Sequence, residues 1–304
     1  MNIRRVVTRK DCIVIATVAV LLIIVDVTLI TVEKKLSKNI LQISKYPEVV
    51  ENIQKADKPT ILIFGNSLID NAVDPELLEQ DFSRKGQNRF EVFKLSADSS
   101  GIWDWYCILK NNFNTGSRMP NIIITGFAWN ELTDQEDPNP SRLDLFCDIG
   151  DLPDLYRLGL RSMDEVSEFL AAKILNIYAE REPISKRILT YLIPYYKDSV
   201  TRMNDNGNAA SDNKTQIKKN FSYNVLQNFL SLGVDSKTKF IFIAMPLSYD
   251  YKIPGDLNDF ISNAGGVLLD YRDPHIFKTY LYRDPIHLDK LGRRIFTSKL
   301  ARDF

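Results

Sequence analysis

The chain has 304 residues, of which 44% are hydrophobic and 26% charged, so it is long enough to bury a substantial core. Basic and acidic residues number 39 each, and this balance gives no indication of a nucleic-acid partner. The three cysteines, Cys12, Cys107 and Cys147, are too few and too scattered to indicate a disulfide scaffold. No cysteine–histidine cluster has the spacing of zinc ligands, and we expect neither a metal nor a cofactor.

A basic tail and an apolar segment open the chain. Residues 1–11 carry four basic side chains, and residues 12–32 form an almost wholly apolar run long enough for a membrane-spanning helix. Its fourteen Ile, Val and Leu residues, each contributing about −0.3 to −0.6 kcal/mol, outweigh one buried aspartate at about +3 kcal/mol. No small-residue cleavage site follows, so we expect a retained signal anchor.

The basic tail favours a cytoplasmic amino end, although Lys34, Lys35 and Lys38 after the span weaken that bias. We therefore expect a single-pass protein of the plasma (inner) membrane with its bulk on the extracytoplasmic side. The one charge of the span, Asp26, either snorkels to the outer end or contacts a membrane helix of a partner.

Residues 33–58 are charged and partly helical in pattern, and we interpret them as a stalk. A globular domain is expected over 59–304, with strands at 60–65, 90–95, 121–126, 239–244 and 266–271. Helical patterns separate most of these strands, at 75–82, 103–112, 223–232 and 257–264, and a last helix is expected over 288–302. This alternation predicts an α/β fold with a five-stranded parallel sheet and helices on both faces, a flavodoxin-like three-layer α/β/α arrangement.

A long insertion, about 135–222, separates the third and fourth strands. Helical periodicity extends over 155–178 and again over 188–193. The insertion is either a cap beside the strand ends or a helical shoulder remote from any site. Within it, residues 204–215 are polar and expected to be mobile.

The first strand ends in the sequence Gly65-Asn66-Ser67-Leu68. A serine at this point lies at the carboxyl edge of a central strand, where open α/β sheets usually bind ligands. Asn66 or Ser67 can instead simply cap the helix that follows.

Near the other end of the chain stands Asp284-Pro-Ile-His287, just before the last predicted helix. This spacing lets a carboxylate orient an imidazole whose other side faces a nucleophile. Alone the pattern is weak, because Asp284 can cap the helix and His287 can lie on the surface. Combined with Ser67, it forms a candidate triad. The second histidine, His275, is not followed by a comparable helix and glycine, and we assign it a structural or substrate-contact role.

Together the two motifs resemble the SGNH (GDSL-like) hydrolase superfamily, over roughly residues 59–304. Residues 65–68 match its first block, commonly Gly-Asp-Ser-Leu, with Asn66 in place of the aspartate. Residues 284–288, followed by Gly292, match its last block. The resemblance implies the SGNH hydrolase fold, with no cofactor.

The resemblance also implies roles for individual residues. Ser67 is the expected nucleophile, His287 the general base and Asp284 the residue that orients it. The family's middle blocks supply hydrogen-bond donors to an oxyanion and match less well. The candidate donors are the amide of Ser67, Gly101 or instead the backbone amide of Ser99 or Ser100, and Asn130, although Asn130 can equally be a turn or cap residue.

Two further residues are candidate substrate contacts. Asn66 adjoins the expected nucleophile, and Trp103 belongs to an aromatic group after the second strand that can stack on a sugar ring. The same aromatic group can instead pack its helix against the sheet. The acidic run 131–137 is interpreted as a solvated loop.

This similarity predicts a membrane-anchored serine esterase or O-acyltransferase that acts on acyl esters of a cell-surface or exported glycan through an acyl-serine intermediate. The anchored members that it resembles commonly work beside a multi-span membrane protein that delivers the acyl donor. The alternative is a catalytically inactive, membrane-tethered subunit that keeps the fold for glycan binding or assembly.

Overall fold

The computed structural model describes residues 38–84, 90–113, 118–135, 138–175 and 221–304, with scattered residues in 10–28 and 178–195. The chain divides into two compact units. The first comprises Met1–Lys38, Pro140–Asp144 and Ser162–Ile217, and the second comprises Asn39–Asn139, Leu145–Arg161 and Lys218–Phe304. The sheet and all the candidate site residues belong to the second unit.

A five-stranded parallel sheet forms the centre of the second unit, with strand order β2-β1-β3-β4-β5. The strands are β1 (Thr60–Gly65), β2 (Glu91–Ser96), β3 (Ile122–Phe127), β4 (Lys239–Ala244) and β5 (Val267–Asp270). Each end lies within one residue of its predicted position. The predicted α/β class and parallel sheet are therefore confirmed, and the strand order is compatible with a flavodoxin-like fold.

Strand β1 occupies the position that matters most for a site. All six of its residues are buried, and its last residue, Gly65, pairs with Ser96 of β2 on one side and with Gly126 of β3 on the other. From β1 the chain first adds β2 on one side of this strand and then adds β3, β4 and β5 on the other side. The direction in which strands are added therefore reverses between β1 and β3. In open α/β sheets, ligands bind at the carboxyl ends of the strands beside this reversal.

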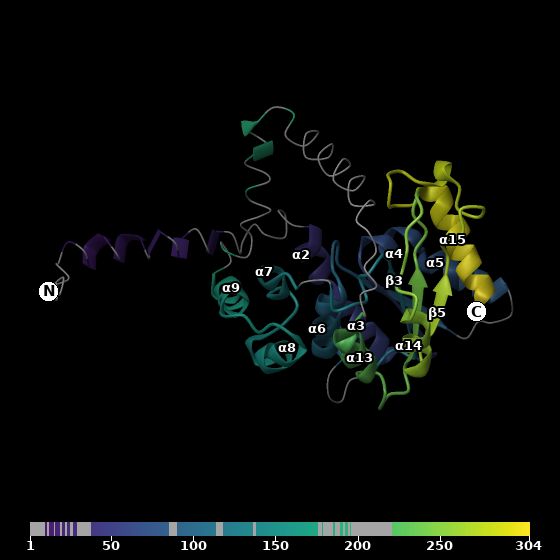
Figure 1. Ribbon diagram of the computed structural model, residues 1–304, viewed down its shortest axis with the longest axis horizontal. Coiled ribbons are helices and arrows are strands. Elements are labelled where there is room, and N and C mark those ends of the chain that lie inside the picture. Colours follow the sequence, from purple (N-terminus) through teal and green to yellow (C-terminus); the bar gives the residue numbers. More distant parts are fainter. Residues whose placement is uncertain are drawn as a thin grey trace. The chain divides into compact units, whose positions relative to one another are not determined.

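Helices cover both faces of the sheet (Figure 1). One face carries α4 (Ser67–Ala72), α5 (Pro75–Arg84) and α15 (Lys290–Asp303), and the other carries α3 (Tyr46–Lys55), α6 (Ile102–Asn112) and α13 (Asn224–Ser231); α14 (Leu257–Asn263) packs on β5. The helices predicted in this part of the chain are present, with ends shifted by at most two residues.

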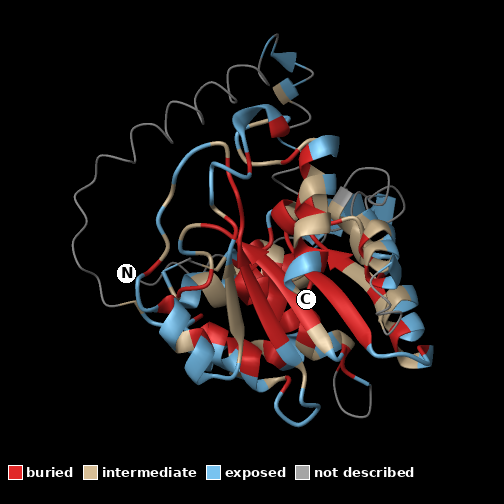
Figure 2. Cartoon of the chain, turned by 90° about the vertical axis from the view of Figure 1, so that its right-hand side faces the viewer, coloured by how far each residue is buried: buried red, intermediate tan, exposed pale blue. Residues whose placement is uncertain are grey.

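Alternating side chains of the strands supply both layers of the core. On β1, Ile61 and Ile63 pack with apolar residues of α5 and α15. Phe64 faces the opposite layer, where its ring meets Trp105 of α6 and Phe229 of α13. This period of two places apolar side chains on both faces, as a sheet covered on both sides requires. The central strands β1, β3 and β4 are accordingly buried between the helices, whereas the edge strands β2 and β5 are only partly buried (Figure 2).

The predicted stalk is wrong for residues 39–58, which belong to the second unit. They contain most of α2 (Lys38–Ile43) and all of α3, whose Ile53 is fully buried. The Tyr46 hydroxyl donates a hydrogen bond of 3.0 Å to the carbonyl of Ser96, at the end of β2. The charged side chains of this segment lie on the exposed face of an amphipathic helix, and they concealed its apolar face in the sequence. Residues 33–37 lie outside the described residues.

The predicted membrane anchor over 12–32 falls on a segment of which the structure describes only scattered residues, and Asp26 is not among them. Within the described part of the chain, no helix combines the length and the apolar character needed to cross a bilayer. The anchor, like the tail 1–11, stays a prediction from the sequence.

The described part of the insertion contains four short helices: α7 (Pro140–Leu143), η1 (Ile149–Asp151), α8 (Leu152–Leu158) and α9 (Met163–Ile174). Helices α7 and α9 belong to the first unit, whereas η1 and α8 belong to the second. Of the predicted helix over 188–193, the structure describes Leu189, Thr190, Leu192 and Ile193, the first three as helical, whereas 204–215 lies wholly outside the described residues. The interpretation of the insertion as a cap or lid stays a prediction.

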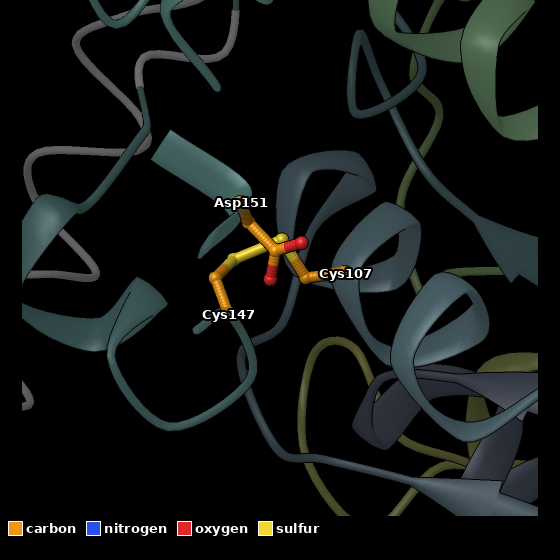
Figure 3. Close-up of side chains that lie close together, drawn as sticks. All are labelled: Cys107, Cys147 and Asp151. Atoms are coloured by element: carbon orange, nitrogen blue, oxygen red, sulfur yellow. A yellow bond between two sulfur atoms is a disulfide. The ribbon is translucent and has the colours of Figure 1, made fainter. Parts of the chain in front are cut away.

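A disulfide bond that the sequence analysis did not predict joins Cys107 of α6 to Cys147 of the insertion. Beside it, the carboxylate of Asp151 accepts hydrogen bonds from Lys110 (2.7 Å) and Asn111 (2.8 Å), both of α6. The two sulfurs and this carboxylate lie within 4.8 Å of one another (Figure 3). Because both sulfurs are in the disulfide, neither is a thiolate ligand, and we do not interpret the group as a metal site.

Replacing Cys107 and Cys147 with serine should lower the free energy of unfolding by about 2–4 kcal/mol, because the bond closes a long loop in the unfolded chain. The loop spans a sequence separation of 40 residues. Urea unfolding of the full chain in detergent, with and without reductant, measures the effect. The Cys12→Ser variant should match the wild type, and equal stability of the oxidised and reduced wild type would show that the bond has no such role.

Candidate active site

The turn from β1 into α4 places Ser67 at the carboxyl edge of the sheet. Gly65 has a φ of +140°, a conformation that side chains rarely adopt, and lets the strand turn sharply. Asn66 is the N-cap of α4, and its side-chain oxygen accepts a hydrogen bond of 3.0 Å from the amide of Leu68. Ser67 is therefore the first residue of the helix, and it is half-buried.

The structure brings Ser67, His287 and Asp284 together. The hydroxyl oxygen of Ser67 lies 2.9 Å from Nε2 of His287, across a sequence separation of 220 residues. On the other side of the ring, Nδ1 lies 2.9 Å from Oδ2 and 3.0 Å from Oδ1 of Asp284. When Nδ1–H donates to the carboxylate, Nε2 is the acceptor that faces the serine hydroxyl. The three side chains thus have the connectivity of a nucleophile, a base and its orienting carboxylate.

Asp284 is held as a carboxylate by its own loop. Its Oδ1 accepts hydrogen bonds from the amides of Ile286 (3.1 Å) and His287 (2.9 Å). Partial burial acts to raise the pKa of Asp284, but the hydrogen bonds from the His287 ring and from these two amides outweigh it and hold the pKa below its usual value. The alternative that Asp284 caps the last helix is wrong, because Asp289 is the N-cap of α15, accepting from the amide of Gly292.

Neighbouring elements hold the loop that carries Asp284 and His287. Both the amide (3.0 Å) and the hydroxyl (2.8 Å) of Ser248 donate to the carbonyl of Pro285. At Gly292, a Cβ atom would lie 2.5 Å from the carbonyl oxygen of Leu281, so only glycine allows α15 to approach this closely. The glycine of the sequence motif therefore serves to seat the loop against the helix.

Lowering the pH should reduce the free energy of unfolding of the wild type by more than it reduces that of the Asp284→Asn variant. A carboxyl whose folded-state pKa lies below its unfolded-state value adds stability above the unfolded-state pKa, and this stability is lost as the pH falls through the folded-state pKa. For Asp284 this window lies below about pH 4. Urea unfolding of both proteins at pH 7 and pH 3 measures the difference, and equal losses of stability would contradict the assigned ionisation.

The three predicted oxyanion donors differ in their surroundings. The amide of Ser67 lies in the first turn of α4, where amides have no acceptor within the helix. The amide of Gly101 already donates a hydrogen bond of 2.9 Å to the carboxylate of Asp104. We therefore do not assign it as a donor to the oxyanion. Asn130 is exposed in the loop after β3, and its role stays a prediction.

The two predicted substrate contacts are buried. Asn66 is 4% exposed and caps α4. Trp103 is 5% exposed, and its ring lies against Gly159, where an added Cβ atom would be 3.5 Å from the ring. Neither side chain offers a face to a ligand, so these two assignments are wrong. The aromatic residues of α6 pack the helix into the fold, as illustrated by Trp105, whose ring nitrogen donates to the hydroxyl of Ser100 at 2.8 Å.

The second histidine lies outside the triad. His275 is exposed, and its amide donates a hydrogen bond of 2.8 Å to the side chain of Asp273 in a short turn. Ser67 therefore faces the histidine that the sequence motif indicated.

Sequence reasoning missed Glu131, which it placed in a solvated acidic loop. Its carboxylate accepts a hydrogen bond of 2.8 Å from the amide of Ala128 and lies 3.4 Å from the side-chain nitrogen of Asn66. Asp134 is also engaged, with the amide of Val225 at the start of α13 (3.0 Å), whereas residues 136–137 lie outside the described residues. The sequence signal that could have found Glu131 is its position, next to Asn130 in the loop that follows the central strand β3.

Comparison with known proteins gives no further identification. The sequence matches no protein-family model, and no curated protein matches it. The functional argument therefore depends on the geometry of the site.

Proposed function

We propose that this protein is a serine esterase or O-acyltransferase of the SGNH type, with Ser67 as nucleophile, His287 as general base and Asp284 as its orienting carboxylate. The observation that carries the proposal is the continuous hydrogen-bonded series from the Ser67 hydroxyl through the His287 ring to Asp284. Its location at the carboxyl edge of β1, beside the reversal of strand order, adds support.

In the proposed reaction, the Ser67 oxygen attacks the carbonyl carbon of an ester while Nε2 of His287 takes the hydroxyl proton. The tetrahedral oxyanion accepts hydrogen bonds from the amide of Ser67 and the side chain of Asn130. Collapse breaks the ester bond, and His287 gives its proton to the departing alcohol, which leaves an acyl-serine. A water molecule or an acceptor hydroxyl, deprotonated by His287, then takes the acyl group and releases Ser67.

We further propose that the substrate is an acyl ester of a cell-surface or exported glycan, and that the protein is anchored in the plasma (inner) membrane with this domain on the extracytoplasmic side. The apolar run 12–32 supports the anchor. The disulfide between Cys107 and Cys147 supports the location, because such bonds persist mainly in oxidising compartments. A multi-span membrane protein that delivers the acyl donor is the proposed partner.

The full chain in detergent should release p-nitrophenolate from p-nitrophenyl acetate in a burst, followed by slower turnover as the acyl-serine is resolved. Adding an oligosaccharide as acceptor should speed the second phase and yield an acetylated sugar if the protein is a transferase, and should leave that phase unchanged if it is an esterase. A wild type that shows neither burst nor turnover would contradict the proposal.

A second candidate function is a non-catalytic, membrane-tethered subunit for glycan binding or assembly. One observation favours it: the Gly101 amide, a predicted oxyanion donor, is occupied by Asp104. This candidate requires glycan binding without a burst, and with equal affinity in the wild type and in the Ser67→Ala variant.

A further inference from the structure

The loops after β1 and β3 are linked by a pair of complementary side chains, Asn66 and Glu131. Asn66 immediately precedes Ser67, and Glu131 immediately follows Asn130. The Asn66 nitrogen lies 3.4 Å from both carboxylate oxygens of Glu131, and its oxygen accepts from the amide of Leu68. The Glu131 carboxylate also closes its own loop, by accepting from the amide of Ala128 at 2.8 Å.

The loop that carries Asn130 needs such support. Trp129 has a φ of +50°, in the left-handed region that a bulky residue rarely adopts, and this conformation persists only where the surroundings enforce it. The amide of Glu131 donates to the carbonyl of Ala128 (3.2 Å), so the turn is closed by both the backbone and the side chain of Glu131.

We propose that Glu131 is a positioning residue, which locks the Asn130 loop to the Asn66–Ser67 turn so that the nucleophile and the oxyanion donor keep one geometry. The inference rests on the proposed function and names a residue that the sequence motifs did not assign. The pairing also accounts for an amide at position 66: an aspartate there would set two carboxylates against each other where an amide now meets one, and like charges this close oppose ionisation.

Exchanging the two functional groups tests the pair, because the exchange can keep every hydrogen bond. In the Asn66→Asp/Glu131→Gln double variant, one oxygen of residue 66 accepts from the amide of Leu68 and the other accepts from the new side-chain amide at 131. The oxygen of that side chain still accepts from the amide of Ala128. Either single variant lacks this complementarity.

The readout is the rate constant for labelling of the full chain by a fluorophosphonate, which reports the reactivity of Ser67 without a natural substrate. Asn66→Asp should lower this rate constant by about tenfold or more and Glu131→Gln by about three- to tenfold, whereas the double variant should recover to within about threefold of wild type. Glu79→Gln is the matched control, because Glu79 also accepts a backbone amide, that of Val92 (2.6 Å), at the amino end of β2, and its labelling should be unchanged.

Urea unfolding of the same proteins separates the two ways of failing. If the wild type does not label at all, the proposed function fails, and the pair is then tested by whether the double variant regains the stability lost in the single variants. If the wild type labels but the effects of the two single variants simply multiply in the double variant, the positioning role of Glu131 is wrong. A variant that regains stability but not labelling would likewise overturn it.

Discussion

The Ser67→Ala variant is expected to lose acyl turnover by about 10³- to 10⁶-fold, because the serine and histidine of such a site act as a unit. The Ser67 hydroxyl is the atom that faces Nε2 of His287 at 2.9 Å, and alanine removes it without altering the cap of α4, which Asn66 supplies. The measurement is the steady-state rate of p-nitrophenyl acetate hydrolysis by the full chain in detergent.

Ser231→Ala is the matched control, since Ser231 is an exposed serine of α13 whose hydroxyl bonds only locally, to the carbonyl of Asn228. It should retain wild-type turnover. The His287→Ala variant should fall to about the level of Ser67→Ala, and the double variant should fall no further. Wild-type turnover in Ser67→Ala would exclude the serine mechanism.

The Asp284→Asn variant is expected to lower kcat by about 10²- to 10⁴-fold with little change in KM. An amide at 284 can still accept the two backbone amides through its oxygen, so the loop should keep its shape. It no longer supplies the negative charge that stabilises a protonated His287, and its nitrogen favours the wrong tautomer of the ring. Kinetics across substrate concentrations separate the two parameters.

Asp273→Asn provides the comparison for this change. Asp273 also accepts a backbone amide in a short turn beside a histidine, that of His275 at 2.8 Å, but it lies outside the triad. Its kcat should equal that of the wild type. Equal losses in the two variants would mean that Asp284 acts by supporting its loop and not through the imidazole.

The parts of the fold that the sequence predicted well are those governed by local pattern. Apolar runs bounded by polar turns placed β1 and β4 to the residue. The proximity of Ser67 and His287 was also predicted, from the Gly-Asn-Ser-Leu motif after β1 and the Asp-Pro-Ile-His motif before α15. The start of α15 was placed two residues early, since the capping side chain is Asp289.

The errors concern features that depend on which face of an element meets the rest of the protein. Trp103 and Asn66 were assigned to a ligand, yet both are buried, because helix α6 and the cap of α4 turn these side chains inward. Charged neighbours concealed the buried face of α3, so Ile53 was placed in a stalk. Spacing alone could not pair Cys107 with Cys147, since their proximity arises when the insertion packs against α6.

Glu131 illustrates the same limit within the site. As part of an acidic run it resembles a solvated residue, and only the pairing of β1 with β3 brings its carboxylate to Asn66. Long-range contacts of this kind follow from the register of the sheet, which a single sequence does not reveal.

The most direct measurement of the central claim is mass spectrometry of the full chain after reaction with a fluorophosphonate, followed by proteolysis to locate the adduct. We predict one adduct, on Ser67, which is absent from the Ser67→Ala and His287→Ala variants. An unmodified Ser67, or an adduct that forms equally well without His287, would contradict the claim that these two side chains form a nucleophile and its base.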